Sequence, residues 1–126
     1  MILFNSYDTY PSPRITLQVA RNARDQSIFD SRTVDAIVDT GFNGWLTLPF
    51  ETINELFLEP VGTDTLILAD GTTTQSHRYR ASVWLGQIER ECLVHRLPGE
   101  PKLGMAFLRH VNITIRNGEV QVDPPY

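Results

Sequence analysis

Ala36-Ile37-Val38-Asp39-Thr40-Gly41 is the stretch on which the fold and the function of this 126-residue sequence depend. The apolar run before Asp39 predicts the end of a strand that is covered on both faces. A strand that ends in a glycine turn can hold a carboxylate rigidly for acid–base chemistry. The same residues also fit a turn in which Asp39 bonds its own backbone. Since Asp-Thr-Gly occurs once, a site with two such acids requires two copies of the chain.

The composition restricts the classes of function. A formal net charge of -4 and an isoelectric point near 5.2 argue against nucleic-acid binding through phosphates. The sequence shows no signal-peptide pattern at its start and no apolar stretch of membrane-spanning length. Cys92 is the only cysteine, which excludes an intrachain disulfide and suits a reducing compartment. We therefore expect a soluble, cytoplasmic protein without nucleic-acid or membrane partners.

Short strands with turn signals between them are predicted along most of the chain. Ile15, Leu17 and Val19 alternate with other residues, which is typical of a half-buried strand. Further strands are predicted at residues 28–38, 45–48, 66–69, 72–74, 80–85, 91–97, 113–116 and 119–122. Two prolines mark an N-terminal arm, residues 1–13, ahead of one mainly β domain, residues 14–126.

Turn and helix signals separate these strands. Asp70-Gly71 and Asn117-Gly118 each predict a two-residue hairpin turn, because type I′ turns need positive φ at both positions. Pro49 can open a helix that the Pro60–Gly62 stretch ends. The residues on its apolar face are Phe50, Ile53, Leu56 and Phe57. A second, shorter helix is predicted at residues 106–108.

Three elements resemble the retroviral-type aspartic proteases, and above all the small bacterial and archaeal branch of that clan. Residues 36–49 are similar to the family's active-site loop through Asp39-Thr40-Gly41, Phe42-Asn43-Gly44 and Leu46-Thr47-Leu48-Pro49. Residues 66–75 occupy the place of the flap hairpin. Leu103-Gly104-Met105, followed by Phe107-Leu108, resembles the hydrophobic-hydrophobic-glycine element before the family's short helix. The likeness covers residues 14–122 and keeps the three elements in order.

The resemblance implies a closed, mostly antiparallel acid-protease fold, with a single-lobe subunit that carries one longer and one short helix. It implies that two chains form one site, in which Asp39 of each subunit binds a shared water. Thr40 would hydrogen-bond across the dimer, and the backbone of Gly41 would accept substrate contacts. Leu103 and Gly104 would be structural. The resemblance implies neither a cofactor nor a metal.

The same resemblance assigns substrate recognition to two segments. The hairpin residues Asp70, Gly71 and Thr72 would close over a bound peptide. Phe42 stands where retroviral enzymes usually carry a small residue, and we interpret it as a specificity element. The predicted partners are therefore a second copy of the chain and a peptide or protein substrate.

The chemistry expected of a paired Asp39 follows from charge repulsion. Two carboxylates about 3 Å apart cannot both ionise cheaply, so the pair holds one proton and titrates as a unit. The ionised acid takes a proton from water, which attacks the peptide carbonyl, and the protonated acid donates to the carbonyl oxygen. The predicted function is an aspartic endopeptidase. The alternative is a non-catalytic dimeric module of the same fold that binds peptides or proteins.

Other candidate residues have simpler explanations. Cys92 and His95 have the spacing of half a metal site without a second pair, and we expect a strand residue and an exposed histidine. Ser76 and His77 are adjacent in a strand and face opposite ways, which argues against a nucleophile–base pair. Asp70 also follows an apolar run, but the glycine after it explains it as a turn residue.

Overall fold

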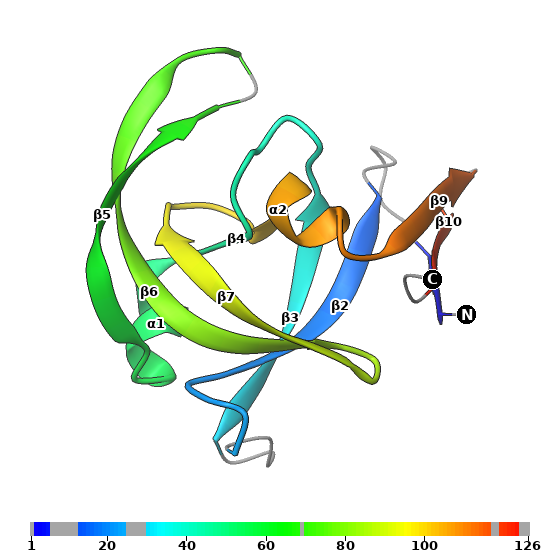
Figure 1. Ribbon diagram of the computed structural model, residues 1–126, viewed down its shortest axis with the longest axis horizontal. Helices are drawn as coiled ribbons and strands as arrows, with labels where there is room; N and C mark the ends of the chain where they lie inside the picture. The colour runs from blue at the N-terminus through cyan, green and yellow to red at the C-terminus, as the bar shows by residue number, and fades with distance from the viewer. Residues whose placement is uncertain (1, 6–12, 25–29, 69, 117–118, 124–126) are drawn as a thin grey trace.

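Strands make up most of the protein, as the sequence predicts (Figure 1). The computed structural model describes residues 2–5, 13–24, 30–68, 70–116 and 119–123. The larger sheet contains β2 (Arg14–Ala20), β3 (Ser31–Val38), β4 (Leu46–Leu48), β5 (Glu59–Ile67), β6 (Thr73–Leu85), β7 (Ile88–Arg96) and β8 (Lys102–Leu103). The helices of the described residues are α1 (Phe50–Glu55) and α2 (Met105–Leu108), and neither is long and apolar enough to cross a membrane.

The larger sheet closes on itself. Its described strands follow the order β2-β3-β8-β4-β7-β6-β5, and β2 pairs additionally with β6. The closing contact joins residues 18–20 to residues 82–84. Within the described part of the chain, strand β5 pairs with β6 alone, and it lies outside the ring. The pairings are antiparallel except for β3 with β8 and β4 with β7, so the sheet is closed and mostly antiparallel.

The hydrophobic core fills the inside of this closed sheet. On β2 the predicted alternation is confirmed, since Ile15, Leu17 and Val19 are at most 1% exposed. On β3 the expectation of a strand covered on both faces is wrong. Ile37 is only half-buried, and Asp35 is exposed and bonds Arg14 of β2 at 3.3 Å. The outer face of β3 therefore carries polar side chains that water and ion pairs satisfy.

Helix α1 is shorter than predicted. Pro49 precedes its first residue, and Ile53 and Leu56 face the core as expected. Phe57 is 76% exposed with a left-handed φ of 53°, and Phe50 is also exposed. The left-handed residue reverses the chain before Pro60 and Gly62, which lie in β5 rather than at the end of the helix.

The hairpin between β5, which ends at Ile67, and β6, which begins at Thr73, has a longer connection than the predicted two-residue turn. The Leu68 N–H donates to the Thr72 carbonyl at 2.8 Å, and the Gly71 N–H donates to the Leu68 carbonyl at 2.9 Å. Gly71 has a φ of 85°. The hairpin reaches past the rest of the sheet (Figure 1).

A second, three-stranded sheet lies on the side away from β5 (Figure 1). It contains β1 (Ile2–Asn5), β9 (Asn112–Arg116) and β10 (Glu119–Asp123), with β10 in the centre. Residues 2–5 of the expected arm are thus paired with the end of the domain. The predicted pairing of β9 with β10 is confirmed, while its turn at 117–118 lies outside the described residues.

Candidate active site

Asp39 follows β3 directly and begins a loop of residues 39–45, called the Asp39 loop below. Its backbone N–H donates to the Leu103 carbonyl at 3.0 Å, which ties the end of β3 to β8. One of its carboxylate oxygens accepts the Gly41 N–H at 2.9 Å. Asp39 therefore bonds its own turn, as the simpler interpretation of the sequence expects. The side chain is half-buried, so solvent or a ligand can still reach it.

The backbone at the start of α2 holds the Asp39 loop in place through hydrogen bonds. The N–H groups of Gly104, Met105 and Ala106 donate to three loop carbonyls, those of Trp45, Phe42 and Gly44, at 3.0, 2.9 and 3.1 Å. A Cβ atom on Gly104 would lie 2.8 Å from the Phe42 carbonyl oxygen and would also meet the Gly44 carbonyl. Gly104 is thus structural, because only glycine lets the backbones approach so closely.

The ring of Phe42 fills the space under the loop. It is 3% exposed and meets the ring of His95 edge to face, with 6.0 Å between centroids. A Cβ atom on Gly44 would come within 2.5 Å of the ring. Phe42 therefore supports the shape of the loop as well as lining a pocket.

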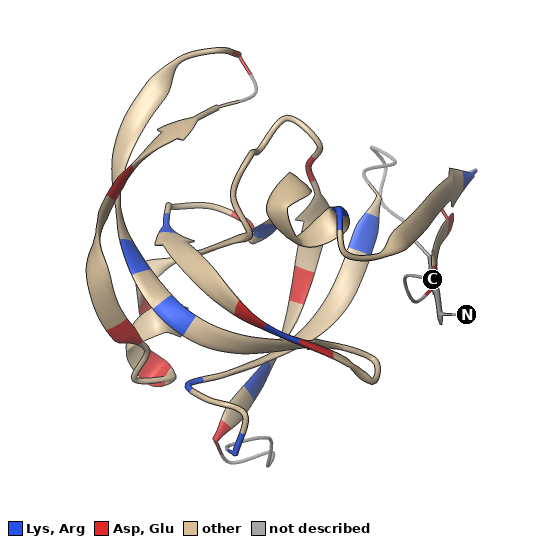
Figure 2. Cartoon of the chain, in the orientation of Figure 1, with Lys and Arg blue, Asp and Glu red and all other residues tan. Residues whose placement is uncertain are grey.

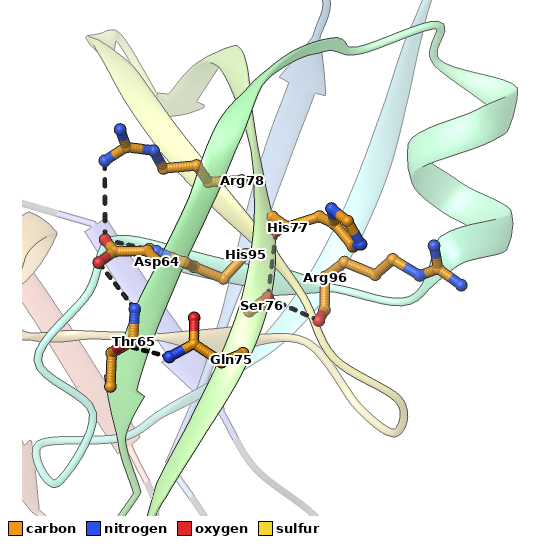
Figure 3. A network of polar contacts seen from close by, with 8 residues as sticks. All are labelled: Asp64, Thr65, Gln75, Ser76, His77, Arg78, His95 and Arg96. Atoms are coloured by element: carbon orange, nitrogen blue, oxygen red, sulfur yellow. Dashed lines mark hydrogen bonds and ion pairs between the residues drawn. The ribbon is translucent and has the colours of Figure 1, made fainter.

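His95 is buried, at 3% exposure, so the expectation of an exposed histidine is wrong. Its Nε2 lies 3.5 Å from a carboxylate oxygen of Asp64 on β5, and its Nδ1 has no hydrogen-bond partner among the described residues (Figure 3). Burial lowers the pKa of His95, and the Asp64 carboxylate only partly opposes this. His95 alternates with Val94, which is fully buried in the core, so the imidazole lies on the opposite face of β7. There it is covered by Phe42 of the Asp39 loop and by Asp64 of β5.

The Asp64 carboxylate joins the hairpin to this buried histidine. It accepts the Thr65 N–H at 2.8 Å and lies 3.7 Å from a guanidinium nitrogen of Arg78 on β6 (Figure 3). The Thr65 N–H and then His95 lower the pKa of Asp64. The side chains of β5, β6 and β7 are thereby connected beneath the Asp39 loop.

A pocket of about 260 Å³ opens beside Asp39. Its walls come from the Asp39 loop, the hairpin and the neighbouring strands, and consist of Asp39, Phe42, Thr47, Leu68, Asp70, Leu97 and Lys102. Of the residues predicted for the site, Asp39, Phe42 and Asp70 are brought together here. Sequence reasoning missed Lys102, although its alternation with buried Leu103 signals a side chain on the outer face.

The remaining predicted site residues lie beside the pocket rather than in its wall. Thr40 and Gly41 are exposed at the turn of the Asp39 loop, and Gly71 and Thr72 are exposed at the hairpin tip. The carboxylate of Asp70 accepts the Thr72 N–H at 2.9 Å and the Thr72 hydroxyl at 2.6 Å. These bonds lower the pKa of Asp70 and account for it as a turn residue.

The other candidates from the sequence do not assemble a site. Cys92 is buried and its pKa is raised to about 12, which opposes thiolate chemistry. Ser76 is buried and donates to the Arg96 carbonyl at 2.8 Å, while His77 is exposed, so the two side chains face opposite ways as predicted (Figure 3). The described residues contain no group of three His, Cys, Asp or Glu side chains that could hold a metal ion.

Charged residues of both signs are interspersed along β5, β6 and β7 (Figure 2). Arg80 of β6 illustrates this, because it pairs with Glu59 of β5 at 3.7 Å and with Glu91 of β7 at 2.9 Å. Such exposed pairs contribute little stability each.

Comparison of the chain with protein-family models, with curated proteins and with solved structures gave no match. The assignment of a function therefore depends on the geometry of the site.

Proposed function

We propose that the protein is an aspartic endopeptidase of the retroviral type, active as a homodimer. The observation that carries the proposal is the position of Asp39. Asp39 belongs to the single Asp-Thr-Gly of the sequence and lies on a loop that hydrogen bonds from the start of α2 hold in place. It lines a pocket that the β5–β6 hairpin also lines. A closed, mostly antiparallel sheet with two short helices in its described part agrees with the acid-protease fold.

The proposed reaction uses one Asp39 from each subunit. The ionised Asp39 takes a proton from the shared water as the water oxygen bonds to the peptide carbonyl carbon. The protonated Asp39 gives its proton to the carbonyl oxygen, which forms a neutral tetrahedral diol. As the diol collapses and the C–N bond breaks, one diol hydroxyl returns its proton to the ionised Asp39 and becomes the new carbonyl. The other Asp39 gives the proton taken from water to the leaving amine nitrogen. Neither carboxylate is consumed, so the pair returns to its starting proton count.

Two features support the dimer. A single chain supplies one Asp39 to its pocket, and a two-fold axis is the way to obtain a pair of equivalent acids. Thr40 lies next to Asp39, is exposed, and its hydroxyl makes no hydrogen bond within the described part of the chain. A hydroxyl in this position is free to bond the facing loop of a second subunit.

The test is proteolysis of a denatured protein between pH 3 and 7, with and without a peptide inhibitor that mimics the tetrahedral diol. We expect inhibitor-sensitive cleavage with a bell-shaped pH profile, because the pair must carry one proton. Specific activity should fall on dilution as the dimer dissociates. Peptide binding without cleavage would favour the binding module instead, and full activity in a strictly monomeric sample would exclude the shared site.

A further inference from the structure

Lys102 is the only lysine of the sequence and lies in the wall of the Asp39 pocket. It belongs to β8, where it pairs with Ile37 of β3 and with Thr47 of β4. Leu103, its neighbour in β8, is fully buried in the core. Because successive side chains of a strand point to opposite faces, Lys102 points away from the core and into the pocket.

The charge of Lys102 is not matched within the described part of the chain. Its side chain is half-buried, and its ammonium makes no ion pair with Asp39 or Asp70 of the same pocket. Asp70 directs a carboxylate oxygen to the N–H and hydroxyl of Thr72. By contrast, Arg14 pairs with two carboxylates on the outer surface. An ammonium without a partner is available to a ligand carboxylate, with which it would form a charge-assisted hydrogen bond.

A second polar group of the pocket suits the same ligand. Thr47 is 2% exposed, and its hydroxyl oxygen accepts the backbone N–H of Lys102 at 3.0 Å. Since that oxygen is already an acceptor, its proton is available to a further acceptor. Leu68 and Leu97 complete the wall with apolar surface, which suits the methylene groups of an acidic side chain.

We propose that Lys102 makes the site select peptides with Asp or Glu at a position adjoining the cleaved bond. This inference rests on the proposed peptidase function. A two-fold axis through the paired Asp39 side chains supplies one Lys102 on each side of that bond. The site therefore accepts an acidic residue on either side of the bond. The positive charge acts in binding and positioning, and the proton transfers remain with Asp39.

The first experiment compares peptides that differ only in having Glu, Gln or Lys beside the cleaved bond. We expect kcat/KM for the Glu peptide to exceed that for the Gln peptide by about 10-fold or more, as a hydrogen bond to a charged group allows. The preference should grow as pH rises through about 4.3, where the glutamate ionises. Equal rates for the three peptides with the native chain would overturn the inference and leave the peptidase function standing.

Two variants connect this preference to Lys102. Lys102→Met keeps the length of the side chain and should cleave the Gln peptide while losing the Glu preference. Lys102→Glu should reverse the preference toward the Lys peptide. A Glu preference that persists in Lys102→Met would overturn the inference, whether or not the charge-reversed variant folds.

A readout independent of cleavage separates the two proposals. Because the chain has one lysine, an amine-reactive acetylating reagent labels Lys102 and the α-amino group, which serves as the internal control in mass spectrometry. In Asp39→Asn, an N-acetylated Glu peptide without lysine should slow the labelling of Lys102, and the Gln peptide should not. Protection without any cleavage by the native chain would refute the peptidase and retain the acidic ligand. Absence of both protection and cleavage would refute both.

Discussion

The Asp39 loop and the hairpin tip at Asp70 share a local turn but differ in their surroundings. In both, a carboxylate oxygen accepts the N–H two residues further on, at 2.9 Å. The Asp39 loop also gives three carbonyls to the start of α2 and rests on Phe42. The tip is held by hydrogen bonds of its own hairpin and is exposed. Turn chemistry alone therefore does not mark an acid as functional, whereas tertiary support around it does.

The largest expected difference between the two turns is the effect of replacing each acid by its amide. Asp39→Asn should lower kcat/KM by at least about 100-fold, because an amide cannot exchange the proton and such steps contribute 10²–10⁴. Asp70→Asn should keep most of the activity, since asparagine also suits the turn. Circular dichroism and the dimer fraction should match the native chain in both. Comparable losses in the two variants would show that the two acids act together.

Adding one methyl group to each supporting glycine tests the difference in packing. Gly104→Ala should lower the free energy of unfolding by about 1–3 kcal/mol, as overpacking does, because its Cβ meets the backbone of the Asp39 loop. Gly71→Ala has no atom within 4 Å of the added Cβ. Its cost should be about 1 kcal/mol from the positive φ alone. Urea unfolding of both variants measures the difference, and a costlier Gly71→Ala would contradict it.

Acid should weaken the support under the Asp39 loop. Burial holds the pKa of His95 below its usual value of 6.5, so between that lowered pKa and pH 6.5 the unfolded chain binds more protons than the folded chain. As the pH is lowered through this range, the free energy of unfolding should decrease by up to about 1.4 kcal/mol per pH unit because of this group. The lowered pKa of Asp64 adds a loss in the same direction near pH 3.8.

The measurement is urea unfolding at pH values from 7.5 to 5. His95→Gln should flatten the dependence of the unfolding free energy on pH in this range. The matched control is His77→Gln, which removes an exposed imidazole from β6. An unchanged slope in His95→Gln would assign the pH dependence to other groups.

The smallest expected effect compares two hydroxyls. Thr40→Ala should weaken dimerisation by about 1 kcal/mol, the usual contribution of one hydrogen bond. Thr72→Ala removes a hydroxyl that already bonds Asp70 within the hairpin and should leave the dimer unchanged. Sedimentation equilibrium measures both dissociation constants. Equal dissociation constants for Thr40→Ala and the native chain would show that the Thr40 hydroxyl does not contribute to the dimer interface.

The sequence predicts those parts of the structure that depend on local patterns. The alternation in β2, the start of α1 directly after Pro49 and the opposite directions of Ser76 and His77 all follow from periodicity and turn residues. The site residues that belong to the predicted motifs are found together, since Asp39, Phe42 and Asp70 line one pocket.

The failures come from tertiary contacts that no local pattern encodes. His95 is buried because the Asp39 loop and β5 cover it, and a histidine in a strand carries no signal of that cover. Phe57 leaves the helical face because the chain must turn into β5. Lys102 enters the pocket through pairing between strands that are distant in sequence.

The pairing of β1 with β10 has a consequence for the order in which the chain is made. Residues 2–5 are synthesised before the strands of the larger sheet, and their partners at 119–123 are synthesised after them. Contacts between segments this far apart in sequence form slowly, because a long loop must close first. The edge of β1 therefore remains without its partner during most of synthesis, and the small sheet is the last part of the fold to assemble.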